Sequence, residues 1–209
     1  MTDQKKSSTS LTLKGQAMRD RIVESAANLI FQLGARETSL DQVREAAGAS
    51  KSQIYHYFSD KDALVRAVID LQAQRILAAE RAALRDVNTL ADFKCWIEQV
   101  IQMGELYGCI GGCPLGSLAN ELAPYNDDQR DALMRHLDSW RAEIERALRR
   151  IAVNEVFGPE LDPLGLSHAF LAAMQGGLMF AKLTQNAEML RLSLRQIVEV
   201  LAVAASARK

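Results

Sequence analysis

The sequence predicts an all-α protein of about nine helices, with a small N-terminal three-helix domain followed by a larger C-terminal helical domain. Apolar residues recur at three- and four-residue intervals along the whole chain, which is the spacing that buries one face of a helix. No stretch alternates apolar and polar residues as a half-buried strand does, and no internal repeat is present. A series of helix-start signals between residues 38 and 64 sets several short helices apart from longer ones.

Length and composition are those of a globular protein with ample core. The chain has 209 residues, of which 48% are hydrophobic and 24% charged. No uninterrupted apolar run approaches ~18 residues, so we expect no membrane-spanning segment. The first residues include Lys5, Lys6 and Lys14 without the apolar segment of a secretory signal, and we therefore expect a cytoplasmic protein.

The first domain begins with a polar, mildly basic arm over residues 1–15, which we expect to be disordered. Such an arm either lies along nucleic acid or only solvates the terminus. A helix over residues 16–33 follows, with apolar residues along one face, and Gly34 ends it.

Three serines then mark helix starts, because each is followed three positions later by a side chain that can bond back to the backbone. The short helices predicted from these signals span residues 40–47 and 51–57, and Gly48 between them tolerates a tight left-handed turn. Two short helices joined by such a turn form a helix-turn-helix. The three pairs are Ser39 with Gln42, Ser50 with Gln53, and Ser59 with Asp62.

The outward face of the second short helix indicates what the motif contacts. Lys51, Ser52, Gln53, Tyr55 and His56 remain exposed once the apolar residues are buried, and most of them are hydrogen-bond donors. A donor-rich helix face suits the major groove of DNA. The alternatives are a solvated face and a surface for protein contacts, since helix-turn-helix units also occur in proteins that do not bind DNA.

The segment TSLDQVREAAGASKSQIYHYFSDKDALV, residues 38–65, resembles the DNA-binding module of the TetR/AcrR family of bacterial repressors. The likeness covers residues 17–65, and Arg44 stands where that family more often has a small residue. The resemblance implies a DNA-binding domain over residues 16–65 and a ligand-binding and dimerisation domain over residues 66–209. The sequence has no phosphate-binding glycine loop and no H-E-x-x-H or G-x-S-x-G motif, so we expect no enzymatic activity. Its implied partners are a double-stranded DNA operator, a small-molecule effector and a second copy of the chain.

Eight residues are predicted DNA contacts. Lys61 lies in the first turn of a fourth helix, where backbone N–H groups favour a phosphate. Net charge is only +1 over residues 1–65 and −2 over the remainder, so a local patch and dimerisation must supply the affinity. We expect Lys51, Ser52 and Gln53 at base edges, Thr38, Tyr55, His56 and Lys61 on phosphates, and Arg44 on either.

Six helices are predicted beyond the helix-turn-helix. The expected ranges are residues 59–85, 90–107 after Asn88 and Thr89, a short helix from Pro114 to the residue before Pro124, 126–151 with Asn126 and Gln129 at its start, 164–183 after a loop over 154–163, and 187–206.

Aromatic and sulfur residues of the second domain are either core or the lining of an effector cavity. The glycine-rich segment GGCPLGSLANEL, residues 111–122, resembles a segment of regulators related to the lincomycin-resistance repressor, which lies beside the effector cavity. A preformed apolar pocket would take a flat hydrophobic or aromatic ligand. The predicted lining is Trp96, Met103, Tyr107, Cys113, Leu118 and Met174.

The three cysteines, Cys95, Cys109 and Cys113, do not form a disulfide framework or a zinc motif, and we expect no metal and no cofactor. Cys113 precedes a helix start, where the helix dipole would lower its pKa. It is therefore either a thiol that senses oxidants or electrophiles, or a small packing residue.

The last two helices carry the features of a dimer interface. Small residues permit close helix crossing, and a long apolar stripe follows on the last helix. The alternative is burial within the same chain. The predicted dimer contacts are Ala173, Gly176, Gly177, Leu190, Ile197 and Leu201. The sequence as a whole thus predicts a ligand-responsive transcriptional repressor that binds a palindromic operator as a dimer.

Overall fold

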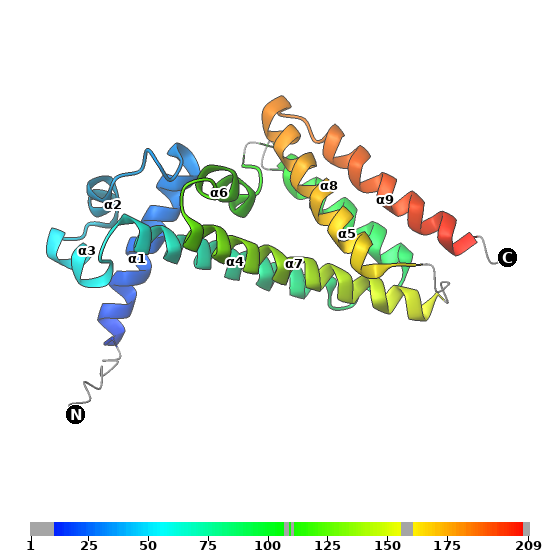
Figure 1. Cartoon of the computed structure of the whole chain (residues 1–209), viewed down its shortest axis with the longest axis horizontal. Coiled ribbons are helices and arrows are strands. Elements are labelled where there is room, and N and C mark those ends of the chain that lie inside the picture. The colour runs from blue at the N-terminus through cyan, green and yellow to red at the C-terminus, as the bar shows by residue number, and fades with distance from the viewer. Residues whose placement is uncertain (1–10, 107–108, 110, 156–160, 207–209) are drawn as a thin grey trace. The chain divides into compact units, whose positions relative to one another are not determined.

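The computed structural model of the chain describes residues 11–106, 109, 111–155 and 161–206, and these residues form nine α-helices without a strand (Figure 1). The predicted all-α fold class is confirmed. The helices are α1 (Leu13–Leu33), α2 (Leu40–Ala47), α3 (Lys51–Tyr57), α4 (Lys61–Leu84), α5 (Leu90–Leu106), α6 (Pro114–Leu122), α7 (Asp127–Asn154), α8 (Pro163–Thr184) and α9 (Glu188–Ser206).

Contacts divide the chain into two compact units, Met1–Val68 (unit 1) and Ile69–Lys209 (unit 2). The boundary falls within α4, so the first turns of this helix belong to unit 1 and the rest to unit 2. Unit 1 holds α1, α2 and α3, and unit 2 holds α5 to α9.

Helix α1 begins three residues earlier than the sequence predicted. Thr12 has extended backbone angles, and its side-chain oxygen accepts a hydrogen bond from the Gly15 backbone N–H at 3.1 Å. Threonine is a favourable N-cap residue, and this cap outweighs the cost of Gly15 in the first turn. Residues 13–15 are therefore helical rather than part of the predicted disordered arm, and residues 1–10 of that arm lie outside the described residues.

Helices α2 and α3 are held by two complete capping boxes, as the sequence predicted. The Ser39 N–H donates to Gln42 Oε1 at 2.7 Å, and the Gln42 N–H donates to Ser39 Oγ at 3.2 Å. Ser50 and Gln53 repeat the arrangement at 2.8 and 3.2 Å. Gly48 adopts the left-handed conformation between the two helices, with φ of 59°.

Helix α4 is capped by Asp60 and not by the predicted Ser59. Asp60 Oδ1 accepts a hydrogen bond from the Ala63 N–H at 2.8 Å, while Ser59 Oγ donates to Asp60 Oδ2 at 2.9 Å. The bond from the Ala63 backbone is the largest cause that lowers the pKa of the Asp60 carboxyl. An ionised carboxylate also complements the helix dipole, which is why it takes the cap ahead of a neighbouring hydroxyl.

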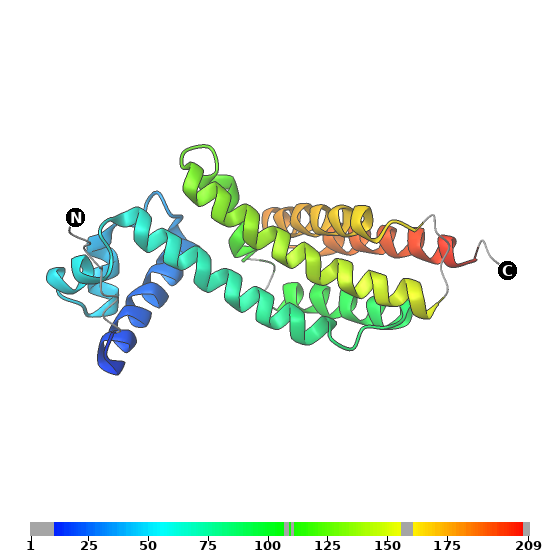
Figure 2. The ribbon, with the colours of Figure 1, turned by 60° about the horizontal axis from the view of Figure 1, so that its bottom comes forward.

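In unit 2, residues 69–84 of α4 lie alongside α7, as Figures 1 and 2 both show. Three polar contacts spaced along the two helices join them, so this part of α4 is attached to α7 at several levels. They pair His136 Nε2 with Asp70 Oδ1 at 2.8 Å, Arg81 Nε with Glu143 Oε1 at 2.5 Å, and Arg150 Nη2 with the Leu84 carbonyl at 2.5 Å.

Helix α8 occupies the middle of a second packing group, against α7 on one side and α9 on the other, and α9 also packs on α5. Gly177 is the point of closest approach between α8 and α9, since a Cβ placed there would lie 2.7 Å from Leu190 Cα. Phe170 of α8 stacks on Trp96 with ring centroids 5.1 Å apart, and Phe93 completes this buried aromatic group.

Among the described residues, α8 is the one helix long and apolar enough to cross a membrane, by length and composition alone. The sequence-based expectation considered only uninterrupted apolar runs, and polar residues such as His168 and Gln175 interrupt this one. A single helix of this kind is weak evidence for a membrane, because core helices meet the same criterion. The contacts of α8 with α7 and α9 account for the part of its apolar sequence that is buried, and other apolar residues of the helix stay exposed.

Candidate functional site

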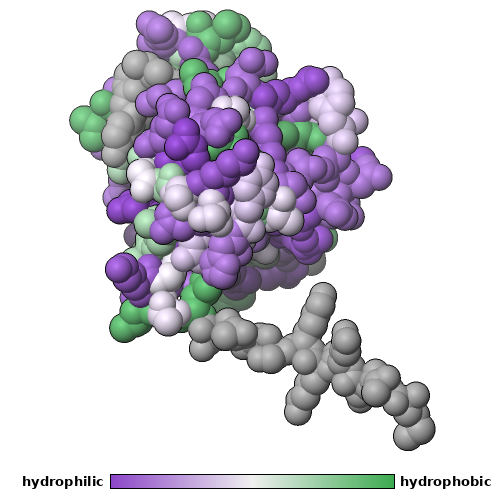
Figure 3. Space-filling view, turned by 90° about the vertical axis from the view of Figure 1, so that its left-hand side faces the viewer, coloured by the Kyte–Doolittle hydropathy of each residue, from purple (hydrophilic) through white to green (hydrophobic). Residues whose placement is uncertain are grey.

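The exposed face of α3 is the first candidate site. Lys51, Ser52, Tyr55 and His56 are exposed, whereas Ile54 is buried and anchors the helix in unit 1. Figure 3 views the molecule from the side that carries α2 and α3, and the surface there is mainly hydrophilic. The structure therefore places four of the predicted DNA contacts together on one accessible surface.

The capping box of α3 limits what Gln53 can offer to a partner. Its Oε1 accepts the hydrogen bond from the Ser50 N–H, so the amide nitrogen is the group that remains for a base edge. Ser52 Oγ lies 3.0 Å from Ser50 Oγ. These local bonds fix the side chains at the start of α3 before any ligand binds, which lowers the entropy cost of recognition.

The structure contradicts the predicted role of Thr38 as a phosphate contact. Thr38 is only 3% exposed, and its hydroxyl donates to the Gly34 carbonyl at 2.8 Å. This residue closes the turn between α1 and α2 and has no surface for a phosphate. Its position at the start of the motif was visible in the sequence, but its burial depends on how α1 packs on α2.

Lys61 and Arg44 already have partners within unit 1. Lys61 Nζ donates to the Arg36 carbonyl at 2.8 Å, and two of its three protons remain for an anion. Arg44 pairs with Asp41 at 3.3 Å and with Glu45 at 3.1 Å along α2. The charge of Arg44 is thus compensated by its own helix, whereas that of Lys61 is not.

The second candidate site is the predicted effector lining in unit 2, and only part of it comes together. Trp96, Cys113, Leu118 and Met174 are buried, but Met103 is 55% exposed and faces away from the core. Trp96 packs face-on against Phe170, so its ring belongs to the core and only its N–H edge is directed elsewhere. Tyr107, which completes the predicted lining, lies outside the described residues.

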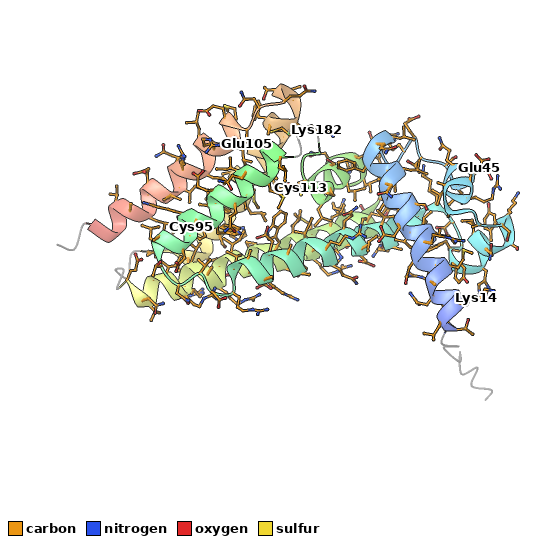
Figure 4. All side chains as sticks on the ribbon, turned by 180° about the vertical axis from the view of Figure 1, so that it is seen from behind. Lys14, Glu45, Cys95, Glu105, Cys113 and Lys182 are labelled. Carbon is orange, nitrogen blue, oxygen red and sulfur yellow. The ribbon has the colours of Figure 1, made fainter. Side chains whose placement is uncertain are left out.

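Cys113 is the N-cap of α6. The sequence suggested that the helix dipole would lower the pKa of its thiol, and the structure shows the opposite shift. Cys113 Sγ accepts a hydrogen bond from the Gly116 N–H at 3.4 Å. Burial raises the pKa of the Cys113 thiol and outweighs this bond. The exposed thiol of Cys95 lies on α5, well separated along the fold from Cys113 (Figure 4). Cys95, Cys109 and Cys113 are all free thiols.

Two polar residues beside Cys113 escaped the sequence analysis. Glu80 of α4 is largely buried, and this burial raises the pKa of its carboxyl to about 7, although the indole N–H groups of Trp140 and Trp96 act in the opposite direction. Gln175 of α8 packs against Gly116, where an added Cβ would collide with Gln175 Oε1. A sequence signal existed for Glu80, because it falls on the buried stripe of α4 in register with Ala73 and Leu84.

The predicted dimer contacts divide between the two faces of the last helices. Gly177, Leu190 and Leu201 are buried within the chain, where α8 meets α9 and α9 meets α5. The alternative of burial in the same chain is therefore correct for these three. Ala173, Gly176 and Ile197 remain partly exposed, and a Cβ at Gly176 would meet nothing within 4 Å.

The opposite side of α8 and α9 is apolar and exposed. Its members lie on one side of each helix, although the exposed Gln196 interrupts the apolar residues of α9 between Leu192 and Val200. Their exposed fractions in the single chain range from 39% to 75%. We call this surface the α8–α9 apolar face, and it consists of Met179, Phe180 and Leu183 on α8 with Met189, Leu192, Val200 and Val203 on α9.

Comparison with known proteins finds two family models on this chain. Residues 22–68 match the model described as bacterial regulatory proteins, tetR family, and residues 89–197 match the tetracyclin repressor-like, C-terminal domain. Together they cover the helix-turn-helix and most of unit 2.

Similar proteins have been described in several bacteria. An uncharacterized HTH-type transcriptional regulator of Lactococcus lactis is 27% identical over 183 residues, which cover 82% of this chain and 87% of that one. The HTH-type transcriptional repressor DhaR of Mycobacterium sp. strain GP1 is 24% identical, over 88% and 92% of the two chains. The crystal structure of a regulatory protein TetR from Rhodobacter sphaeroides superposes with a TM-score of 0.78 at 22% identity, over 87% of this chain and 97% of that one.

Proposed function

Because this chain belongs to the TetR family of bacterial regulatory proteins, we propose that it is a dimeric repressor that binds a palindromic DNA operator and leaves it when a small molecule binds unit 2. Its coarser role as a DNA-binding transcription regulator follows from the family. The observation that best supports the finer proposal is the exposed, donor-rich face of α3, whose first turn is fixed by the Ser50–Gln53 capping box.

In this proposal α3 enters the major groove. Lys51, Ser52 and Gln53 contact base edges, and Tyr55, His56 and Lys61 contact phosphates on either side. Arg44 contributes less, because its ion pairs with α2 would have to break first. Two copies of α3 related by a two-fold axis would read half-sites about 34–36 Å apart or a multiple of that distance.

The salt dependence of DNA binding tests this surface. Duplexes that bind the purified protein are selected from a random library, and their affinity is measured over a range of salt concentrations. Lys61→Ala should weaken binding to all selected duplexes and flatten the logarithmic salt slope by about one unit for each phosphate that it leaves without a cation. Lys94→Ala removes an exposed lysine of α5 and serves as the matched control, with no change in slope. Equal slopes for both variants would contradict the proposal.

Dimerisation would use the α8–α9 apolar face and not the buried stripe of Leu190 and Leu201. Against a second copy, two helices from each chain would form a four-helix bundle about a two-fold axis. An exposed apolar surface on two adjacent helices supports this choice, since patches of that kind mark interfaces. Ala173, Gly176 and Ile197 then lie at its edge.

The proposed response to a ligand depends on α4. Its residues 69–84 are bonded to α7, while residues 61–68 belong to unit 1, and one continuous helix holds both segments. A ligand that binds better to one arrangement of α4 and α7 shifts the chain toward it. A coupling of about 1–3 kcal/mol would lower operator affinity roughly 5–150-fold.

A thiol-based trigger at Cys113 is the second candidate function. Its place beside Glu80 and Gln175 favours a role in ligand response, but a raised pKa leaves little reactive thiolate at neutral pH. We therefore propose that Cys113 contributes shape and capping to the ligand site. The Cys113→Ser variant separates the two candidates. If it no longer responds to electrophiles but still releases operator with an inert aromatic compound, Cys113 is a thiol sensor; if its response to both is unchanged, Cys113 is a packing and capping residue.

A further inference from the structure

Five residues from five helices of unit 2 gather around one buried carboxyl. Glu80 comes from α4, Trp96 from α5, Cys113 from the start of α6, Trp140 from α7 and Gln175 from α8. The indole N–H groups of both tryptophans lower the pKa of the Glu80 carboxyl. The Glu80 charge raises the pKa of the Cys113 thiol, and the Gln175 amide lowers it. We call these five residues the Glu80 cluster.

Three polar atoms of the Glu80 cluster are buried without a hydrogen bond of normal geometry: Glu80 Oε2, Trp140 Nε1 and Gln175 Nε2. Trp140 still lies close enough to Glu80, and Gln175 to Cys113, to lower the pKa of these groups, so the contacts are present but incomplete. Trp140 is only 4% exposed, so its N–H has no access to bulk water. Native proteins leave few buried polar groups unpaired, since each costs about 1–3 kcal/mol. Three incompletely bonded atoms in one cluster call for a further partner, and a ligand would supply it.

The charges around Glu80 decide which ligand suits the cluster. Among the described residues, no cation on the neighbouring helices pairs with this carboxyl. Arg81, the next residue of α4, is turned toward Glu143 on α7, which also pairs with Arg146. The groups that act on Glu80 are the indoles of α5 and α7, the Glu80 charge in turn acts on the thiol of Cys113, and the amide of α8 lies beside that thiol. The cluster therefore carries no positive charge and, when Glu80 ionises, one negative charge.

We propose that the Glu80 cluster is the recognition point of the effector site and that its ligand is an aromatic cation whose protonated nitrogen pairs with Glu80. The inference rests on the proposed function, because it names the ligand of unit 2. A carboxylate has about four acceptor positions, enough for the two indole N–H groups and the ligand together. Gln175 Nε2 remains to donate to an acceptor on the ligand. An anionic ligand would instead meet a buried carboxyl without a counter-charge.

Ligand binding is then linked to proton release. Below pH 7 the Glu80 carboxyl holds its proton in the free protein, because burial raises its pKa to about 7. A cation requires the ionised form, so the proton must leave when the ligand binds. Affinity for a cation should rise up to about tenfold per pH unit below pH 7 and level off above it. A neutral ligand should show no such rise.

Intrinsic fluorescence reports on this site alone, since the chain has 2 tryptophans and both belong to the Glu80 cluster. We would titrate the full chain with three planar probes of the same shape: 2-naphthamidine as the cation, 2-naphthamide as the neutral compound and 2-naphthoate as the anion. The amidine should quench tryptophan emission at concentrations at least about tenfold lower than the naphthoate, with the pH dependence described above.

Two variants distinguish the contribution of the Glu80 carboxyl from a general effect of removing one negative charge. Glu80→Gln should abolish both the preference for the amidine and its pH dependence, because the amide cannot ionise. Asp131→Asn, which removes an exposed carboxyl on α7, should retain both. Circular dichroism at the titration temperature confirms that each variant is folded.

Three results would overturn the inference: absence of quenching by the amidine, equal affinity for the naphthoate, or unchanged amidine binding by Glu80→Gln. Operator binding, followed in parallel, separates this failure from that of the proposed function. If the naphthoate binds and releases operator, the repressor proposal stands and only the ligand class is wrong. If the protein never binds a selected duplex, the repressor proposal itself fails.

Discussion

At the scale of single residues, two neighbouring glycines of α8 have opposite surroundings. Gly177→Ala places a Cβ 2.7 Å from the Leu190 backbone, so α8 and α9 must separate. We expect a loss of about 1–3 kcal/mol in the free energy of unfolding, measured by urea denaturation. Gly176→Ala is the matched control, because its Cβ meets nothing within 4 Å and alanine favours the helix by up to ~1 kcal/mol. Equal losses would show that close crossing is not what requires Gly177.

Glu80 gives a prediction about stability and pH. The folded chain holds the Glu80 proton more tightly than the unfolded chain, since the pKa rises from 4.5 to about 7. The free energy of unfolding should therefore fall as pH rises between these values, by about 3 kcal/mol at most. Glu80→Gln removes this loss, so the variant should match the parent near pH 4.5 and exceed it above pH 7.

Thermal denaturation at several pH values checks this expectation. The exposed Asp131→Asn variant serves again as control, and its difference from the parent should be the same at every pH. A parent and a Glu80→Gln variant whose midpoints keep a constant difference from pH 4.5 to pH 8 would show that Glu80 is not ionising in a buried setting.

The roles of some single residues could not be predicted from the sequence. The register of Glu80 on α4 was visible, but a carboxyl in an apolar stripe is read as exposed unless the neighbouring helices are known. Thr38 was placed on the DNA because of its position in the motif, and its burial follows from packing between α1 and α2. Residue roles that depend on a second helix could not be predicted from one segment.

At the scale of elements, α6 tests whether Cys113 is a cap or a sensor. Its buried Sγ accepts from the Gly116 N–H, whereas Cys95 is exposed on α5. Iodoacetamide should therefore alkylate Cys95 at least about tenfold faster than Cys113, as followed by peptide mass spectrometry. Cys113→Ser should keep the cap, and Cys113→Ala should cost about 1 kcal/mol. Faster alkylation of Cys113 than of Cys95 would support the hypothesis that Cys113 is a sensing thiol.

Helices themselves were largely predictable, because their signals are local. The capping boxes of α2 and α3 and the left-handed Gly48 are properties of adjacent residues, and all three occur in the structure. The N-cap of α4 is Asp60 and not the predicted Ser59, because both side chains can accept from the same backbone N–H groups. The charged carboxylate forms the stronger hydrogen bond there. Such neighbouring alternatives leave an uncertainty of one or two residues at helix ends.

At the scale of the whole molecule, the face that we propose for dimerisation was not predictable from periodicity. Helix α9 is apolar on two sides, and its sequence does not say which side meets α5 and α8. The structure buries Leu190, Leu194 and Leu201 and leaves Leu192 and Val200 exposed. A stripe found by spacing alone is assigned correctly only when the partner helices within the chain are known.

A single charged substitution tests whether the α8–α9 apolar face is the dimer interface. Leu192→Glu, at a side chain 55% exposed in the single chain, should halve the mass measured by light scattering at micromolar concentration. A glutamate there would be buried without a partner in the dimer, which costs several kcal/mol. Operator affinity should fall with it, because a single α3 reads one half-site. Val153→Glu, at a residue 77% exposed on α7, should leave the mass unchanged. A dimer that survives Leu192→Glu would exclude this face.

A dimer formed through the α8–α9 apolar face, as proposed, would also have a consequence for gene dosage in the cell. When chains are scarce relative to the dissociation constant of the dimer, the number of dimers varies with the square of the number of chains. Halving the copies of the gene would then lower the dimers available for the operator about fourfold by mass action. Repression would therefore increase more steeply than the number of chains. Dimerisation through this apolar surface would make operator occupancy depend on a threshold number of chains in the cell.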